Sequence, residues 1–271
     1  MGLPLKRYKS LLLALICLPV ATAQAQVPPL EPVNMTARYD ASVGVLPLGH
    51  MFATVHETPL HYDMELNTKS QGLVDMIAPM KSIARVSGHR SEDGDYLAND
   101  YTALDSKEDS KNDKSVHLQY DGDGKLAERE RHPEDDPAWR PAVPREKAEN
   151  APDPMTGFFR HRKILHDMMA RNVRDASIVT YDGARLARLN FHVVSRARIQ
   201  VMGKDVDAIN TMLTRQPMDG YTPKELRKFA AGDPPIHVYF SADGRFLPLM
   251  AGIELPYGEV KIVLSKYEEI K

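Results

Sequence analysis

The stretch "LNFHVVSRARIQV", residues 189–201, decides the fold. Apolar and polar side chains alternate along it, which is the period of a β-strand with one buried face. We expect its apolar residues to share that face: Leu189, Phe191, Val193, Ala197, Ile199 and Val201. Val194 and Ser195 interrupt the alternation. At ~3.4 Å per residue the strand would span about 40 Å, which is long for a globular domain. Because such a strand usually bends within a curved sheet, the stretch favours a barrel-like wrap over a flat sandwich.

The same alternation recurs on both sides of this strand. It is clear at 37–45 and 60–67, and the segments 236–240 and 245–250 flank the turn "SADG". The segment 259–267 also reads as a strand, with two partly apolar faces, as expected of a strand that is covered on both sides. Shorter strand candidates are 73–78, 82–87, 97–104 and 115–120. We therefore expect a mainly β protein with a single strongly curved antiparallel sheet, a half-open or spiral β-barrel. One amphipathic helix would lie across the sheet, and a second helix would be short. Residues 37–271 would form one domain, preceded by a flexible segment over 26–36.

One segment has the period of a helix instead. Asp153 and Pro154 form a helix start, an N-cap residue followed by proline at the first position. A helix over 155–170 gathers its large apolar side chains on one broad stripe: Met155, Phe158, Phe159, Leu165, Met168 and Met169. This stripe either packs into the core or closes a hydrophobic cavity as a plug or lid. In the second case the candidate ligand-binding residues are Phe158, Phe159, Leu165, Met168 and Met169, because such flexible side chains adapt to variable partners.

Two histidines on this helix raise the question of a metal site. His161 and His166 are five residues apart, so their side chains point about 140° apart around the axis. Two ligands of one zinc ion on a helix are four residues apart, about 40° around the axis. We therefore expect no metal here, and we expect both histidines to lie on a solvated polar face.

Two other segments depart from the β pattern. Residues 121–152 are rich in proline and charge and poor in apolar side chains, which predicts an exposed loop. Trp139 is its one large apolar side chain, and it either docks on the body or stays exposed. Thr222 and Glu225 match a capping box, which predicts the short second helix over 222–230.

The first 25 residues predict a cleaved secretory signal peptide. A positive segment with Lys6, Arg7 and Lys9 precedes an apolar core over 11–20, and small residues lead up to a cleavage position after Ala25. This core is too short for a permanent membrane span, which needs ~20 apolar residues. Cleavage would remove these three of the 35 basic residues and leave 32 against 37 acidic ones. That balance argues against a nucleic-acid partner, which would require a basic face.

No motif points to catalysis. The chain has no nucleophile elbow, phosphate-cradling loop or dinucleotide fingerprint, and the only cysteine, Cys17, lies in the expected signal peptide. The segment 121–125, "DGDGK", resembles the start of a calcium loop, but His132 stands where the loop requires a bidentate glutamate. We therefore expect no catalytic residue, no metal and no cofactor.

Several segments together resemble one bacterial family. They are "YDASVGVLPLG" at 39–49, "DPMTGFFRHRKI" at 153–164, "YDGARLARLNF" at 181–191, "RQPMDGYTPKELRKF" at 215–229 and the C-terminal stretch 234–268. The chain is similar to the uncharacterised exported family known as domain of unknown function 3108, over most of 37–267. The resemblance implies a periplasmic, mostly antiparallel β protein without an assigned activity. By fold analogy alone, a curved sheet with a helix across its mouth is similar to periplasmic lipoprotein carriers.

These observations lead to three hypotheses. The first is a monomeric, non-enzymatic periplasmic protein that binds a hydrophobic ligand, a lipid or a lipoprotein acyl chain, in cell-envelope maintenance. The second is a scaffolding protein of the envelope with a solid core, whose segment 121–152 recruits a partner protein. The third, a hydrolase acting on an envelope polymer, would require a convergent pair of acid and base that the sequence does not display.

Overall fold

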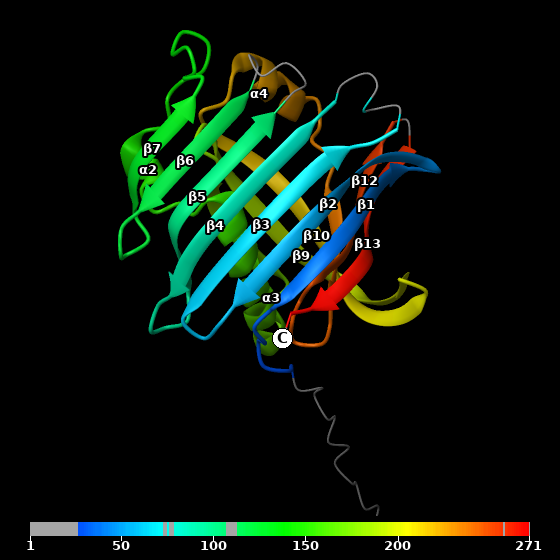
Figure 1. The fold of residues 1–271 in the computed structure, drawn as a ribbon. Helices are drawn as coiled ribbons and strands as arrows, with labels where there is room; N and C mark the ends of the chain where they lie inside the picture. Colours follow the sequence, from blue (N-terminus) through cyan, green and yellow to red (C-terminus); the bar gives the residue numbers. More distant parts are fainter. Residues whose placement is uncertain (1–26, 73–74, 76–78, 107–112, 257, 271) are drawn as a thin grey trace, which may run out of the picture.

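The computed structural model describes residues 27–72, 75, 79–106, 113–256 and 258–270. The expected signal peptide and most of the strand candidate 73–78 lie outside these residues. The described chain forms one antiparallel sheet of 13 strands that is strongly curved and does not close, with helix α3 against its concave side (Figure 1). The mainly β, half-open barrel expected from the alternation is confirmed.

Nearly every strand pairs with its neighbours in sequence. The order is β7-β6-β5-β4-β3-β2-β1-β13-β12-β11-β10-β9-β8. The pairing of β1 with β13 joins the two ends of the chain in the middle of the sheet and leaves β7 and β8 as its edges. In chain order the strands are β1 (Met35–Val43), β2 (Leu46–Glu57), β3 (His61–Ser70), β4 (Lys81–Arg90), β5 (Tyr96–Ser106), β6 (Lys114–Tyr120), β7 (Leu126–His132), β8 (Asp175–Tyr181), β9 (Leu186–Val201), β10 (Lys204–Asp219), β11 (Ile236–Ser241), β12 (Pro248–Leu255) and β13 (Gly258–Glu269).

The long strand β9 bends at a β-bulge. Val193 pairs with Thr211 and Ser195 pairs with Asn210, so Val194 is an extra residue in the ladder. Because a bulge of one residue reverses the alternation, apolar residues before and after it lie on opposite faces of the strand. The expectation that all six apolar residues of 189–201 share one face is therefore wrong. Phe191 packs against α3, whereas Val201 is buried near the tip of the β9–β10 hairpin.

The N-terminal segment over 26–36 is not a flexible leader within its described part. Val33 and Met35 are buried in the core, and the Val33 amide donates to the Glu57 carboxylate at 2.9 Å. The Glu31 amide also donates to the Gly244 carbonyl. These contacts tie the segment to β2 and to the turn between β11 and β12, both distant in the sequence, which the sequence pattern could not reveal.

The segment 121–152 is also more ordered than expected. It contains the edge strand β7, on which Glu128 and Glu130 are exposed, and helix α2 (Arg145–Ala148). The prediction of one exposed loop is therefore wrong in part. A strand at the edge of a sheet can carry many charged residues, so β7 lacks the apolar alternation by which a core strand is recognised. Trp139 is 60% exposed and does not dock on the body.

Helix α3 (Pro154–Arg171) begins at the N-cap that the sequence predicts. The Asp153 carboxylate accepts from the Met155 and Thr156 amides, and Asn172 ends the helix in the left-handed conformation. Gly157 allows α3 to approach β8, because a Cβ atom there would lie 2.8 Å from the Thr180 methyl group. The second helix, α4 (Pro223–Ala230), has the expected capping box. Among the described residues, no helix is both long and apolar enough to cross a membrane.

Candidate ligand-binding cavity

A cavity of about 330 Å³ lies between the first turns of α3 and the concave face of the sheet. Its wall comes from strands on both sides of the β1–β13 pair and from α3. It is formed by Met35, Tyr39, Met51, Ala53, Met64, Leu66, Pro154, Met155, Phe158, Pro248, Met250, Ala251 and Ile262. The interior is therefore not packed solid, which differs from the core that the scaffolding hypothesis expected.

The wall of the cavity is apolar almost throughout. Five of its side chains are methionines, and each comes from a different element: β1, β2, β3, β12 and α3. Tyr39 carries the one side-chain hydroxyl, and this group donates to the Pro248 carbonyl at 3.1 Å. Burial, together with the neighbouring Tyr267, raises the pKa of Tyr39 well above its ordinary value, so the hydroxyl stays neutral. The cavity thus presents hydrocarbon and thioether groups to its contents.

Of the candidate residues on α3, the structure brings only Phe158 to the cavity. Phe159 is fully buried between Tyr62 and Tyr96, with ring centroids 4.5 and 5.3 Å away. Leu165 and Met169 pack in a second apolar cluster, and Met168 is buried elsewhere in the core. The expectation that all five line a cavity is therefore wrong, because the helix is covered on several sides by the rolled sheet. Met155 and the strand methionines, which the helical wheel did not single out as ligand contacts, take their place.

A buried ion pair anchors the middle of α3. Arg162 and Glu57 are both fully buried, and Arg162 Nη1 lies 2.7 Å from Glu57 Oε2. The other guanidinium nitrogens donate to the carbonyls of Arg245 and Glu31, each at 2.8 Å. Glu57 also accepts from the Tyr96 hydroxyl. All partners of Arg162 are distant in sequence, so sequence reasoning had no signal for this pair.

The N-cap of α3 is buried as well. Asp153 is inaccessible to solvent, and its Oδ2 atom has no hydrogen-bond partner among the described residues. Burial raises the pKa of Asp153 to about 6, against the opposing effect of the hydrogen bonds from the first turn of α3. One turn along, the Thr156 hydroxyl lies 2.8 Å from the Tyr62 hydroxyl and joins the helix to β3. These contacts fix the end of α3 that faces the cavity.

His161 does not lie on a solvated face, contrary to expectation. Its ring stacks on Phe191 with centroids 3.7 Å apart and meets Phe240 edge-on at 4.9 Å. Burial lowers the pKa of His161 to about 3, so the imidazole is neutral and acts as an aromatic core residue. His166 is half-buried and its Nδ1 lies 3.1 Å from Asp167. No group of three metal-ligating side chains exists within the described part of the chain.

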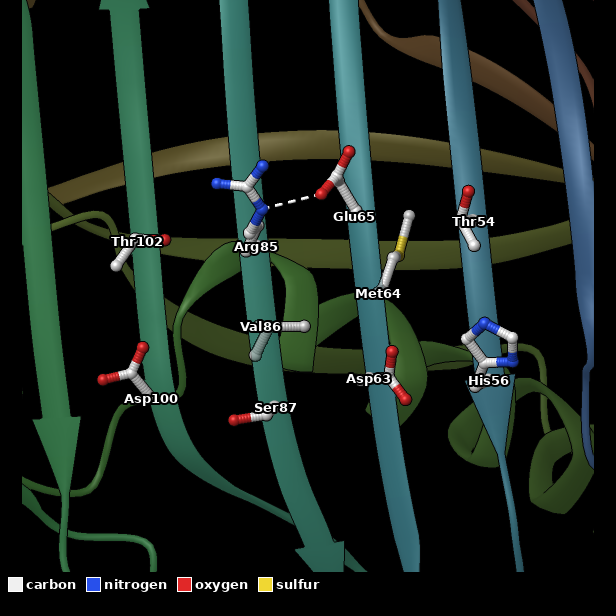
Figure 2. Close-up of a pocket in the computed structure, with 10 residues that line it drawn as sticks. All are labelled: Thr54, His56, Asp63, Met64, Glu65, Arg85, Val86, Ser87, Asp100 and Thr102. Atoms are coloured by element: carbon white, nitrogen blue, oxygen red, sulfur yellow. Dashed lines mark hydrogen bonds and ion pairs between the residues drawn. The ribbon is translucent and has the colours of Figure 1, made fainter.

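The convex face of the sheet has a polar hollow of about 450 Å³ (Figure 2). His56, Asp63, Asp100 and the ion pair between Glu65 and Arg85 lie along β2–β5 there, with α3 behind the sheet. Hydrogen bonds from Asn67 and Arg85 hold the pKa of Glu65 below its ordinary value. A general acid at neutral pH requires the opposite shift. This hollow therefore has the character of a solvated sheet face.

The comparison with known proteins places the chain in a family. The model of the family described as protein of unknown function (DUF3108) matches residues 38–265. The chain belongs to the DUF3108 family. No curated protein matches this DUF3108 sequence.

One solved structure supports the fold of this DUF3108 chain. The chain is similar to a β-barrel-like protein of domain of unknown function DUF1849 from Brucella abortus, with 12% identity and a TM-score of 0.50 over 90% of this chain and 100% of that one. A hypothetical protein of Chlamydia trachomatis matches with 13% identity and a TM-score of 0.33, over 88% of this chain and 87% of that one. The first likeness agrees with the observed barrel-like architecture and concerns the fold alone.

Proposed function

We propose that this DUF3108 protein is a periplasmic, non-enzymatic binding protein for a hydrophobic ligand, a lipid or a lipoprotein acyl chain, and that it acts in cell-envelope maintenance. The observation that carries the proposal is the apolar cavity of about 330 Å³ under α3. Ligand pockets typically measure about 300–1,000 Å³ and are lined mainly by apolar side chains. The secretory signal expected over residues 1–25 supports the periplasmic location.

Filling the cavity tests the proposal. Ala53 is buried and its side chain lines the cavity, so Ala53→Phe places a ring in the space that the ligand would occupy. The probe is 11-(dansylamino)undecanoic acid, whose fluorescence increases in an apolar site. We expect Ala53→Phe to weaken probe binding at least about tenfold, equivalent to 1.4 kcal/mol.

The neighbouring residue on β2 offers a matched control. Thr54 lies on the convex face, in the polar hollow, so Thr54→Phe adds the same ring outside the barrel. We expect this variant to bind the probe as the wild type does. A wild-type protein that binds no probe, or equal loss in both variants, would refute the proposal. If the wild type binds the probe and only Ala53→Phe loses it, mass spectrometry of organic extracts from the protein purified from periplasm would identify the natural ligand.

A further inference from the structure

We infer that the cavity accepts one unbranched alkyl or acyl chain, tail first, to a depth of about ten methylenes, and leaves the head group of the ligand outside. This inference rests on the proposed function and specifies its ligand class. Three properties of the cavity lead to it: the chemistry of its wall, the flexibility of its side chains and its volume.

The wall offers nothing that would recognise a head group. Among its residues, Tyr39 alone has a polar side chain, and the Tyr39 hydroxyl is already bonded to the Pro248 carbonyl. No charged side chain lines the cavity. A phosphate, carboxylate or sugar placed inside would lose its water without gaining a partner, which is strongly unfavourable. The part of the ligand that enters is therefore hydrocarbon.

The methionines favour a flexible chain over a rigid ring system. Met35, Met51, Met64, Met155 and Met250 converge on the cavity from five elements. Methionine side chains are unbranched and adopt many shapes at low cost, so they fill the space around a chain whose conformation varies. A rigid polycyclic ligand would instead be matched by a wall of branched and aromatic side chains in fixed positions.

The volume limits how much of the chain can enter. A water molecule occupies about 30 Å³ of the liquid, and a methylene group is of roughly the same size. The cavity of about 330 Å³ therefore holds roughly ten methylenes, or about two-thirds of a common membrane acyl chain. The two chains of a diacyl lipid would require roughly 900 Å³ by the same estimate. The distal part of one chain is therefore enough to fill the cavity, and the two chains of a diacyl lipid cannot both enter in full.

This capacity predicts how affinity depends on chain length. Burying one methylene is worth about 0.8 kcal/mol, which is about a fourfold decrease in Kd. In a series of fatty acids from hexanoic to hexadecanoic acid, each added methylene should therefore tighten binding about fourfold until the cavity is full. Beyond roughly ten methylenes we expect the affinity to reach a plateau and stay constant with chain length, because further carbons stay in water.

Two methionines of α3 give a variant that changes the depth of the cavity and a matched control. Met155 and Met168 are both buried, but only Met155 lines the cavity. Met155→Ala removes three heavy atoms from the wall, so the plateau should move to chains about two to three methylenes longer. Met168→Ala removes the same atoms elsewhere in the core and should leave the plateau unchanged. Met250→Ala, from β12, is the second wall variant if Met155→Ala does not fold.

The experiment is competition of each ligand with 11-(dansylamino)undecanoic acid, below the concentration at which the ligands form micelles. Decanoic acid, decanol and decyl maltoside test the head group, and we expect their Kd values to agree within about threefold. Affinity that rises without a plateau to hexadecanoic acid, or that changes more than about tenfold with the head group, would overturn the inference while the proposed function stands. Failure of every ligand and of the probe would overturn the proposed function itself.

Discussion

Replacement of His161 by phenylalanine tests the assignment of this residue to the core. The imidazole stacks on Phe191 at 3.7 Å, and its Nε2 atom is buried without a hydrogen-bond partner among the described residues. A phenylalanine ring can occupy the same place between Phe191 and Phe240. We therefore expect His161→Phe to fold and to be at least as stable as the wild type at pH 7.5.

The pH dependence of the unfolding free energy gives the size of the effect of His161. Burial lowers the pKa of His161 to about 3, whereas an unfolded histidine titrates near 6.5. The stability that the neutral ring provides is thus complete above pH 6.5, and it is lost as the pH falls from 6.5 toward 3 because only the unfolded chain takes up the proton. At pH 4.5, two units below the unfolded pKa, the loss is about 2.7 kcal/mol at ~1.36 kcal/mol per unit.

Urea unfolding at pH 7.5 and 4.5 measures this effect. From pH 7.5 to pH 4.5 we expect the unfolding free energy of the wild type to fall by about 2.7 kcal/mol more than that of His161→Phe, because the variant has no group to protonate at this position. The control is His61→Phe, which replaces an exposed ring and should not reproduce the gain. If the unfolding free energies of the wild type and His161→Phe changed equally between the two pH values, His161 would be open to protonation in the folded state, and the reasoning would fail.

Two further substitutions test the anchoring of α3. Asp153→Asn keeps the N-cap but removes the buried charge. Since burial raises the pKa of Asp153 from 3.8 to about 6, its charge destabilises the wild type as the pH rises from about 4 to 6, by up to about 3 kcal/mol. The variant should therefore be more stable in urea at pH 7.5 but not at pH 4, and the absence of any gain at pH 7.5 would contradict this. Arg162→Met leaves Glu57 buried without its partner and should cost about 3–5 kcal/mol of unfolding free energy, whereas adding Glu57→Leu should restore part of the loss. Additive losses in the double variant would show that the two side chains do not act as a pair.

The sequence predicts those parts of the fold that depend on neighbouring residues. Period-two alternation gives most of the strands, and the length of β9 indicates the curvature of the sheet. Val194 was visible as an interruption, but its consequence depends on the partner strand, where Val193 and Ser195 pair with adjacent residues of β10. The N-caps of α3 and α4 were equally local and were predicted correctly.

The candidate site was predictable only in outline. A helix with Phe and Met side chains was visible, and Phe158 does line the cavity. The remaining wall consists mainly of one or two residues from each of several strands, so no window of sequence contains its pattern. The prediction that His161 faces solvent was wrong for a different reason, because it followed the polar character of histidine rather than its position on the helix. At 100° per residue His161 lies between Met168 and Leu165 on the apolar stripe, which is the buried side of α3. Tertiary contacts, rather than local preferences, decide the wall of the cavity.

The buried side of α3 also bears on whether this helix could move as a lid. A lid that swings away would have to separate Arg162 from Glu57 and from the carbonyls of Arg245 and Glu31, and would expose Phe159. Separating a buried, fully bonded ion pair costs several kcal/mol, and the exposed aromatic surface adds to this. The cavity, by contrast, meets only the first turns of α3, at Pro154, Met155 and Phe158. These contacts hold α3 in place against the sheet. On the proposed function the helix would therefore serve as a fixed plug, and side-chain movement of the methionines, rather than displacement of α3, would provide the adaptability that a bound chain requires.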